Sequence, residues 1–362
     1  MKRKYILPLL LPVQFAVLKI LAFFPEFVEE YYSNGFYLKI SAAERWLFGR
    51  LPFPIGDICY GVLIFWLLWS VWRNRKTLRS SWKEHLLKFL GIVSMMYFLF
   101  HFFWGVNYYR VRLGDKLGLD VVQNADDLDN QYTDAELLDF TKRLIEKTNA
   151  IQIQITKNDS AKVVFPYSQH DVFDKNVDGY AALAQHYPSF AYRQPSIKKS
   201  LISLPLTYMG FAGYLNPFTG EAQVNDMMPM YAFPATASHE MAHQLGYASE
   251  SEANFIGYLA VVKNQDLYFQ YSGYSMALRY CLSNWEVRDE KTFEALLDTV
   301  NPGIRENFQE SQRFWEQYET FLETGFKIFY DNFLKLNQQD EGLESYNRFV
   351  DFLVNYYKME KL

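Results

Sequence analysis

The sequence has only two cysteines, a small net charge and no glycine-rich phosphate-binding loop. Cys59 and Cys281 are too few for a disulfide framework or for a metal site built on cysteine. With 36 basic and 41 acidic side chains the formal net charge is −5, so the chain does not offer a basic surface for nucleic acid. We also find no internal repeat and no low-complexity tract. Disulfide scaffolds, nucleic-acid-binding proteins and phosphate-loop enzymes are therefore disfavoured.

Aromatic residues are abundant instead, at 18% of the chain, and three long apolar runs lie near the N-terminus. They cover about residues 5–24, 55–72 and 86–106, and each approaches the roughly 20 residues that a helix needs to cross a bilayer. The first run follows Lys2-Arg3-Lys4 and lacks a small-residue cleavage site, so we interpret it as an uncleaved membrane helix. We predict a membrane region at 1–106 with these three transmembrane helices, and a polar, aromatic loop at 25–54. The alternative is a set of buried helices in a soluble protein.

Basic residues predict the orientation of this region. The loop between the second and third runs contains one acid, Glu84, and six basic residues: Arg73, Arg75, Lys76, Arg79, Lys83 and Lys88. Because basic loops stay on the cytoplasmic side, the N-terminus and this loop are predicted to be cytoplasmic. Three crossings then place residues 107–362 outside the cytoplasm, as an extracytoplasmic domain of a multi-pass membrane protein.

The most informative motif is His-Glu-x-x-His at His239, Glu240 and His243. Residues four apart share one face of a helix, so both imidazoles can bind one metal ion while Glu240 handles a proton. Pro234 suits the first turn of such a helix, and Gly246 suits the position just past its last turn. The alternative is that the pattern arises by chance.

A catalytic zinc usually has three protein ligands, and the following helix offers Glu250 and Glu252. We prefer Glu250 because Asn254 lies four residues on and can hydrogen-bond a ligand as a second-shell group. Ser249 to Glu252 has the pattern of a capping box, which gives Glu252 a separate local role. Glu252 as the ligand remains the alternative.

One Zn²⁺ held by His239, His243 and Glu250 would keep a position for water, with Glu240 as the general base. Candidate donors for the oxyanion, chosen by residue type alone, are Tyr208, Tyr214, Tyr231, Tyr274 and Arg279. The remaining histidines have no catalytic motif around them. We expect interfacial or packing roles for His85 and His101, and surface or satisfied polar positions for His170 and His186.

The outer domain is predicted to be α+β and mostly helical. Strand signals occur at 201–208, 211–215 and 221–225, with a turn at 216–220, and an edge strand of this hairpin could bind an extended peptide. Residues 111–132 resemble a linker, and 160–195 mix short segments. Thr133 and Glu136 form a predicted capping box. Further helices are expected near 133–150, 251–263, 273–284, 289–299, 303–335 with breaks, and 341–358.

The segment HEMAHQLGYASESEANF at 239–255 resembles gluzincin-type zincin peptidases, whose third ligand is a Glu on a following helix. The resemblance implies that Glu250 is that ligand, although its spacing from His243 is much shorter than in thermolysin-type enzymes. Together with NYYRVRLGDKLGL at 107–119, LNPFTGEAQVN at 215–225 and the apolar N-terminus, it resembles a bacterial membrane family known as domain of unknown function 3810. This likeness covers nearly the whole chain and implies a metallopeptidase-like site in the bacterial cell membrane, but no substrate.

Two functions follow as hypotheses. The first is a membrane-anchored zinc metallopeptidase, with the lipid bilayer and a peptide or protein substrate as partners. The second is a zinc-binding membrane sensor or scaffold without catalytic activity. Glu240 discriminates between them, because a structural zinc site needs ligands but no general base. An intramembrane protease is disfavoured, since the motif lies in a polar region of the sequence.

Overall fold

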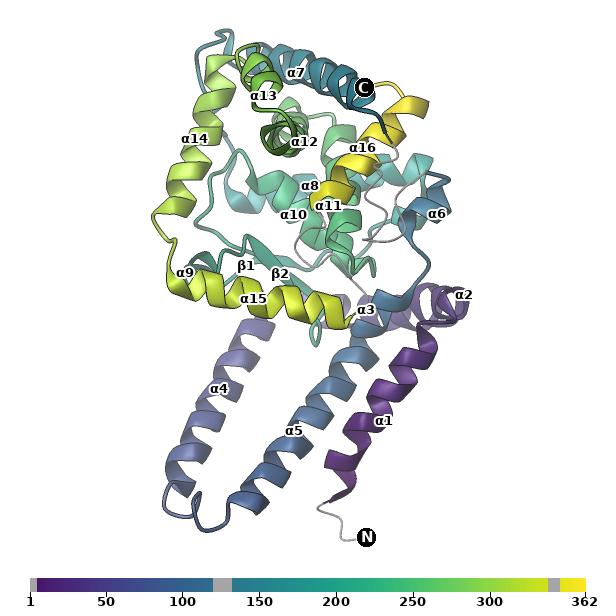
Figure 1. The fold of residues 1–362 in the computed structure, drawn as a ribbon, viewed down its shortest axis with the longest axis vertical. Coiled ribbons are helices and arrows are strands. Elements are labelled where there is room, and N and C mark those ends of the chain that lie inside the picture. The colour runs from purple at the N-terminus through teal and green to yellow at the C-terminus, as the bar shows by residue number, and fades with distance from the viewer. Residues whose placement is uncertain (1–4, 120–131, 338–345) are drawn as a thin grey trace.

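The computed structural model describes residues 5–119, 132–337 and 346–362. Three long helices project from a helical body (Figure 1). They are α1 (Ile6–Leu21), α4 (Ile55–Asn74) and α5 (Trp82–Phe103). Their free ends, the N-terminus and the connection from α4 to α5, lie at the end of the molecule away from the body (Figure 1). The basic loop and the body therefore lie at opposite ends of α4 and α5.

Two of the three helices, α4 and α5, are long and apolar enough to cross a membrane. A third span is present only if α1 and the helical segment Pro25–Phe48, which meet at an angle of 99°, form one broken crossing. By length and composition, the structure thus has two helices that could span a membrane, or three if the bent pair is one crossing.

Residues 25–48 are helical, so the prediction of a loop over 25–54 is wrong for most of its length. The segment consists of α2 (Pro25–Phe27), the π-helical η2 (Val28–Phe36) and α3 (Tyr37–Phe48). Its buried side chains include Val28, Tyr37, Ser41 and Arg45. Contacts of these side chains with the rest of the protein stabilise helical structure that the mixed polar and aromatic sequence does not reveal.

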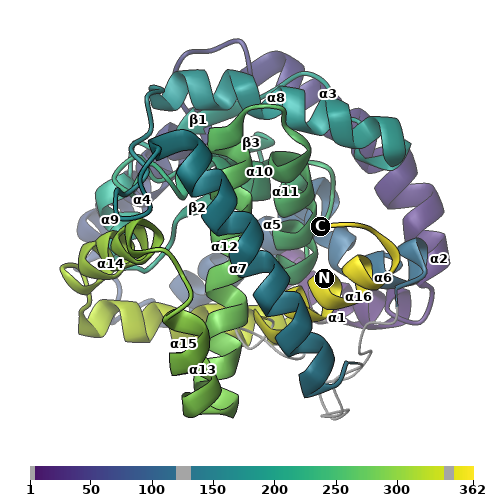
Figure 2. The same cartoon turned by 90° about the horizontal axis from the view of Figure 1, so that it is seen from above.

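The body is built mainly of helices, as predicted. Its core lies between α7 (Asp134–Thr156), α10 (Phe233–Gln244), α11 (Glu250–Lys263), α12 (Leu267–Arg288) and α16 (Tyr346–Met359), with α10 and α11 at the centre in the view from above (Figure 2). The shorter or peripheral helices are η3 (Gly105–Tyr109), α6 (Leu113–Leu117), η4 (Pro188–Phe190), α9 (Ser203–Tyr208), α13 (Glu290–Leu297), α14 (Pro302–Glu316) and α15 (Phe321–Leu336).

The helices predicted in the body are confirmed within the described residues, which leave out 341–345 of the one predicted at 341–358, and two segments predicted as non-helical contain further helices. The capping box of Thr133 and Glu136 begins α7 as expected. Residues 160–195, predicted as short segments, contain the long helix α8 (Gln169–His186), which starts at a second capping box of Ser168 and Asp171. The predicted linker at 111–132 includes α6, and its residues 120–131 lie outside the described part of the chain.

A small sheet has the strand order β1-β3-β2. Its strands are β1 (Ile197–Lys199), β2 (Gly213–Asn216) and β3 (Glu221–Val224). β3 pairs parallel with β1 and antiparallel with β2, and the turn predicted at 216–220 joins β2 to β3. The strand predicted at 201–208 is wrong, because this segment contains α9. Pro205 has no amide hydrogen for a sheet ladder, whereas the first turn of a helix tolerates it.

The sheet rests on the end of α4 nearest the body. The backbone amides of Ile55 and Gly56, which begin α4, donate to the carboxylate of Glu221 in β3 at 3.0 and 2.6 Å. Asp57 accepts from the amide of Leu201 at 2.7 Å and from the hydroxyl of Tyr214 in β2. A carboxylate at a helix N-terminus is favourable because it accepts amides that have no partner within the helix. The predicted membrane region and outer domain are therefore joined by buried polar contacts.

Candidate metal centre

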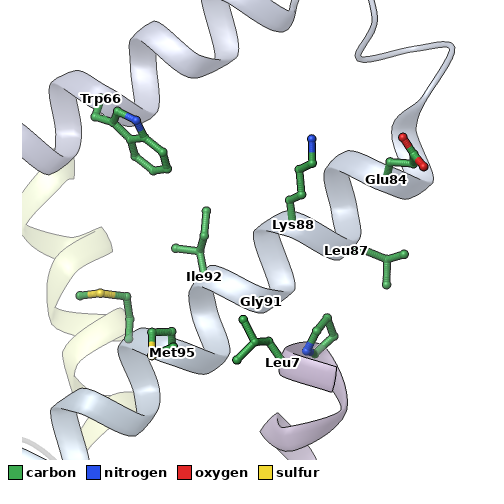
Figure 3. A pocket seen from close by; sticks show the side chains of 10 residues that line it. Leu7, Trp66, Glu84, Leu87, Lys88, Gly91, Ile92 and Met95 are labelled. Carbon is green, nitrogen blue, oxygen red and sulfur yellow. The ribbon is translucent and has the colours of Figure 1, made fainter. Parts of the chain in front are cut away.

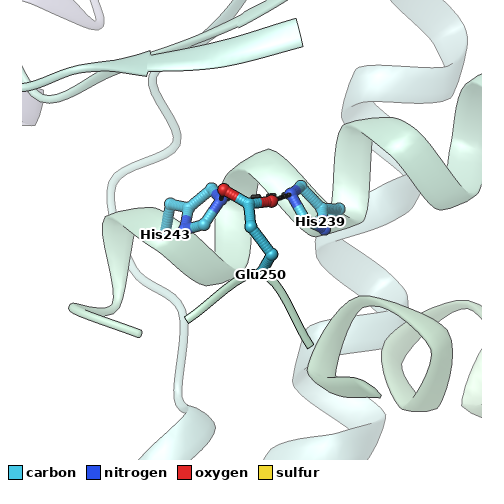
Figure 4. A group of neighbouring side chains, drawn as sticks. All are labelled: His239, His243 and Glu250. Atoms are coloured by element: carbon cyan, nitrogen blue, oxygen red, sulfur yellow. Dashed lines mark hydrogen bonds and ion pairs between the residues drawn. The ribbon is translucent and has the colours of Figure 1, made fainter. Parts of the chain in front are cut away.

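Helix α10 carries the His-Glu-x-x-His motif at the centre of the body. It has Pro234 in its first turn, and Gly246 follows its end with φ +84°, a left-handed conformation that favours glycine. Both predicted boundaries are therefore confirmed. The reversal at Gly246 brings the start of α11 back beside α10, which places Glu250 next to the two histidines (Figure 4).

The side chains of His239, His243 and Glu250 converge on one point (Figure 4). Nε2 of His239 lies 3.0 Å from Nε2 of His243 and 3.2 Å from Oε2 of Glu250. Nε2 of His243 lies 3.7 Å from Oε1 of Glu250. Tetrahedral zinc with ligand distances near 2.0–2.2 Å separates its ligands by about 3.3–3.5 Å. These three residues therefore fit the donor set of a metal ion such as zinc.

Groups around this set hold its members in place. Nδ1 of His243 lies 2.7 Å from the carbonyl of Tyr247, so a proton on Nδ1 leaves Nε2 free to bind a metal. The indole of Trp104, just after α5, donates to the carbonyl of His243 at 3.2 Å. The hydroxyl of Tyr330 in α15 donates to Oε1 of Glu250 at 2.6 Å. The centre is thus supported by residues on both sides of the predicted boundary at 106/107.

Asn254 does not make its predicted contact. Its side chain is buried, but within the described ranges it has no hydrogen bond to His239, His243 or Glu250. Tyr330 and the carbonyl of Tyr247 provide the supporting contacts instead. No motif surrounds Tyr330, which lies 80 positions after Glu250, so sequence reasoning had no signal by which to find it.

Burial and neighbouring charges shift the pKa values of the acidic groups in opposite directions. Burial raises the pKa of Glu240 to about 7, with Glu250 acting in the same direction and the two histidines opposing it. Burial also tends to raise the pKa of Glu250, but His243 and His239 outweigh it and hold this pKa well below its usual range. The carboxylate of Glu250 is therefore favoured in its ionised form, which suits a metal ligand, and the pKa of Glu240 is raised toward the range useful for a general base.

The pKa of His243 follows the same pattern of opposing effects. Burial lowers it, but the charge of Glu250 and the hydrogen bond to Glu250 outweigh burial and raise the pKa to about 9. The histidines and Glu250 are therefore electrostatically coupled, as expected for side chains that would share one cation.

Glu240 occupies a buried position between α10 and strand β2. A Cβ at Gly213 in β2 would lie 2.6 Å from Oε1 of Glu240, so only glycine leaves room for this carboxylate. Oε2 of Glu240 has no hydrogen-bond partner among the described residues. A buried carboxylate oxygen without a partner is costly, and a water, a ligand or a proton bound there would relieve that cost.

Glu252 does not cap α11, so that prediction is wrong. Oε1 of Glu252 accepts from the backbone amide of Leu113 at 2.6 Å, and the hydroxyl of Ser249 lies 3.0 Å from that of Ser251 instead. Leu113 is the first residue of α6, and its amide has no partner within that helix. A contact between distant segments has therefore displaced the local capping interaction, and it holds Glu252 away from the metal-ligand set.

The predicted oxyanion donors lie in other contacts. The hydroxyl of Tyr214 donates to Asp57, and that of Tyr231 is paired with Ser311 at 2.7 Å. Tyr208 packs against Tyr318, and Tyr274 against Tyr258 in the core. Within the described residues, none of these four tyrosines forms a hydrogen bond or ring contact with the ligand set, while Arg279 lies beside Tyr231.

His101, His170 and His186 have the roles expected of them, whereas the interfacial role expected for His85 stays a prediction. His101 is buried, with Nδ1 3.0 Å from the carbonyl of Tyr97 and Nε2 3.3 Å from Oδ1 of Asn337. His170 pairs with Asp174 on the surface, and His186 is exposed. His85 lies 3.4 Å from the hydroxyl of Thr77 at an exposed position.

A separate cavity of about 610 Å³ lies between α1, α4 and α5 (Figure 3). Its lining is mainly apolar and includes Leu7, Trp66, Ile92 and Met95, with Glu84 and Lys88 at one end (Figure 3). It lies among the helices that are apolar enough to cross a membrane, away from the metal-ligand set. We assign no chemistry to this cavity.

The fold and the convergent side chains define a mostly helical protein with two or three possible membrane spans and a possible His-His-Glu metal site. The family described as protein of unknown function (DUF3810) matches residues 32–354, and the chain belongs to this family. The match crosses the predicted boundary at 106/107, so it includes α4 and α5 as well as the metal-ligand set. No curated protein and no solved structure matches the chain.

Proposed function

We propose that this protein is a membrane-anchored zinc peptidase with a zincin-like catalytic centre. The observation that supports the proposal is the convergence of His239, His243 and Glu250 beside a buried Glu240 with an unpartnered oxygen. Metal ligands alone would serve a structural site equally well. A carboxylate that titrates near neutral pH beside them is what hydrolysis needs in addition.

Each residue of the proposed catalytic centre has a separate role. A zinc ion bound by the three ligands would lower the pKa of water and polarise a substrate carbonyl. Glu240 would accept one proton as the water oxygen attacks the carbonyl carbon, and would pass it to the leaving amine as the C–N bond breaks. Tyr330, whose hydroxyl already lies at the ligand set, is our proposed donor to the negative charge on the carbonyl oxygen.

Strand β2 offers a place for an extended peptide. It pairs with β3 on one side and is an edge strand in the sheet formed by the described residues. Gly213, the first residue of β2, is in contact distance of Glu240. A peptide that adds to this edge by main-chain hydrogen bonds would therefore pass beside the proposed general base.

The test is the substitution Glu240→Gln. Gln has a similar size and helix propensity, so folding and zinc binding should persist, while peptide hydrolysis should fall by about 10²–10⁴-fold. His239→Ala is the matched control and should lose zinc and activity together. Metal analysis and digestion of a peptide library by the purified protein give both readouts. If zinc-loaded wild type and Glu240→Gln are equally active or equally inactive on all substrates offered, the sensor or scaffold hypothesis replaces the peptidase.

We also propose that the body faces away from the cytoplasm of a bacterial cell. The basic loop between α4 and α5 lies at the end opposite the body, and basic loops stay inside (Figure 1). This orientation holds whether or not α1 crosses the membrane. A reporter that is active only in the cytoplasm, fused after Leu362, should be silent, and a reporter that needs export should be active. The opposite pair of results would reverse the topology.

A further inference from the structure

Helix α15 exposes an unusual number of large apolar side chains. Phe321 is 83% exposed, Ile328 61%, Phe329 66% and Leu336 65%. These positions are separated by 7, 1 and 7 residues, which places all four on one face of the helix. The charged side chains of α15 pair along the helix, Lys327 with Glu323 at 2.6 Å and Lys335 with Asp331 at 2.8 Å. A contiguous apolar face of this kind marks an interaction surface.

The opposite face of α15 is attached to the body and to α5. Leu334 is fully buried, and the ring of Phe333 lies 5.8 Å from that of Phe100 in the last turn of α5. Asn337, directly after α15, contacts His101 of α5 at 3.3 Å. Tyr330 reaches Glu250 at the metal-ligand set. The helix is thus fixed at the level where α5 enters the body.

The position of α15 identifies what covers its outer face. It lies at the level where the ends of α4 and α5 reach the body, roughly perpendicular to them (Figure 1). Leu201, just before α9, and Leu204, within α9, are also exposed, and α9 lies at the same level (Figure 1). Exposed apolar side chains therefore occur both on the two helices that could span a membrane and at the level of α15. A bilayer that surrounds α4 and α5 would meet this face at its surface, where helices with one apolar face and charged flanks lie in the interface.

We propose that α15 lies in the bilayer surface with Phe321, Ile328, Phe329 and Leu336 among the lipids, and that it holds the metal centre beside the membrane. Phe329 then faces lipid while the next residue, Tyr330, contacts Glu250, so one helix, about 10 Å thick, separates the centre from the bilayer. The next step rests on the proposed peptidase function. With the centre held beside the bilayer, the substrates are chains that are themselves anchored in the membrane and are cut close to its surface.

The lipid contact is tested with an environment-sensitive fluorophore on a single cysteine. Phe329→Cys and, separately, Phe321→Cys are made in a Cys59→Ser background, since Cys281 is buried. The matched control is Val287→Cys, at an apolar position that is 90% exposed in α12 close to α13, at the end of the molecule away from α4 and α5. In vesicles containing lipids with a quencher near the headgroup, emission from positions 329 and 321 should shift to the blue and fall several-fold. Emission from position 287 should not change.

Equal quenching at all three positions, or none at 329 and 321, overturns the lipid contact. A blue shift at position 329 that appears only at high protein density would mean that a second copy of the protein covers this face, and would also overturn the lipid contact.

The proposal about membrane-anchored substrates is tested with a peptide library, offered to the reconstituted protein either with a palmitoyl chain on each peptide or without one. Faster cleavage of the anchored peptides supports it, and equal cleavage refutes it. If neither kind of peptide is cleaved, the result contradicts the proposed peptidase function, and the quenching experiment still decides the lipid contact.

Discussion

Helices α4 and α10 have opposite relations between polarity and burial. α4 leaves Val62, Phe65 and Leu68 exposed, whereas α10 buries Glu240, His243 and Gln244. Exposed apolar side chains are favourable in lipid, and buried polar side chains are tolerated where they have partners. Gln244 meets this condition, since it donates to the carbonyls of Ser196 and Gly220 and accepts from Tyr192.

The exceptions on α10 are more informative than the rule. Oγ of Ser238, Nδ1 of His239 and Oε2 of Glu240 are buried and have no hydrogen-bond partner among the described residues. The last two belong to the motif that carries the proposed chemistry. The comparison shows that α4 exposes apolar side chains without cover, whereas α10 buries polar side chains, some of whose atoms have no partner among the described residues.

The largest expected effect is on zinc binding, and it distinguishes the roles of the two acidic residues at the start of α11. Glu250→Gln should weaken zinc binding by more than the about 10–100-fold that loss of a supporting group costs, because it removes a ligand charge. Glu252→Gln is the matched control: it keeps an acceptor for the amide of Leu113, so zinc binding should persist and stability should change by about 1 kcal/mol. Zinc titration and thermal unfolding give both readouts. Zinc loss in Glu252→Gln alone would reverse the ligand assignment.

A second pair of variants tests whether the exposed side chains of α4 face lipid rather than water. Leu68 and Val287 are 65% and 90% exposed, but only Leu68 lies in a helix able to cross the membrane. Leu68→Arg should cost about 2.5–3.5 kcal/mol of insertion free energy, because the guanidinium enters lipid. Val287→Arg should change stability by less than about 0.5 kcal/mol, as expected for a water-exposed position. Insertion assays and thermal unfolding measure these effects, and equal costs would contradict a bilayer around α4.

The smallest expected effect concerns the fit between β2 and α10. In Gly213→Ala, the new Cβ would lie 2.6 Å from Oε1 of Glu240 and 2.8 Å from the carbonyl of Gln223. The carboxylate must therefore shift, and kcat should fall roughly tenfold, since a full 1 Å displacement costs about 100-fold. Zinc binding should stay unchanged. The control is Gly61→Ala in α4, where a Cβ would meet nothing within 4 Å. Unchanged activity in Gly213→Ala would remove β2 from the proposed catalytic arrangement.

The sequence by itself determined the features that depend on near neighbours along the chain. The four-residue spacing of His239 and His243 places both on one face of α10, and the capping box of Thr133 and Glu136 begins α7. The lengths of the apolar runs located α4 and α5. These features follow from helix geometry and from bilayer thickness, which are the same in every protein.

Only the tertiary structure decided how distant segments meet. Tyr330 reaches Glu250 across 80 positions, and Trp104 reaches the carbonyl of His243 across 139. Glu252 also contacts Leu113 across 139 positions and loses its predicted capping role. Such contacts depend on how whole helices pack, and packing is fixed by the summed burial of many side chains rather than by a local pattern. The candidate metal ligands could therefore be named from the sequence, whereas the groups that hold them in place could not.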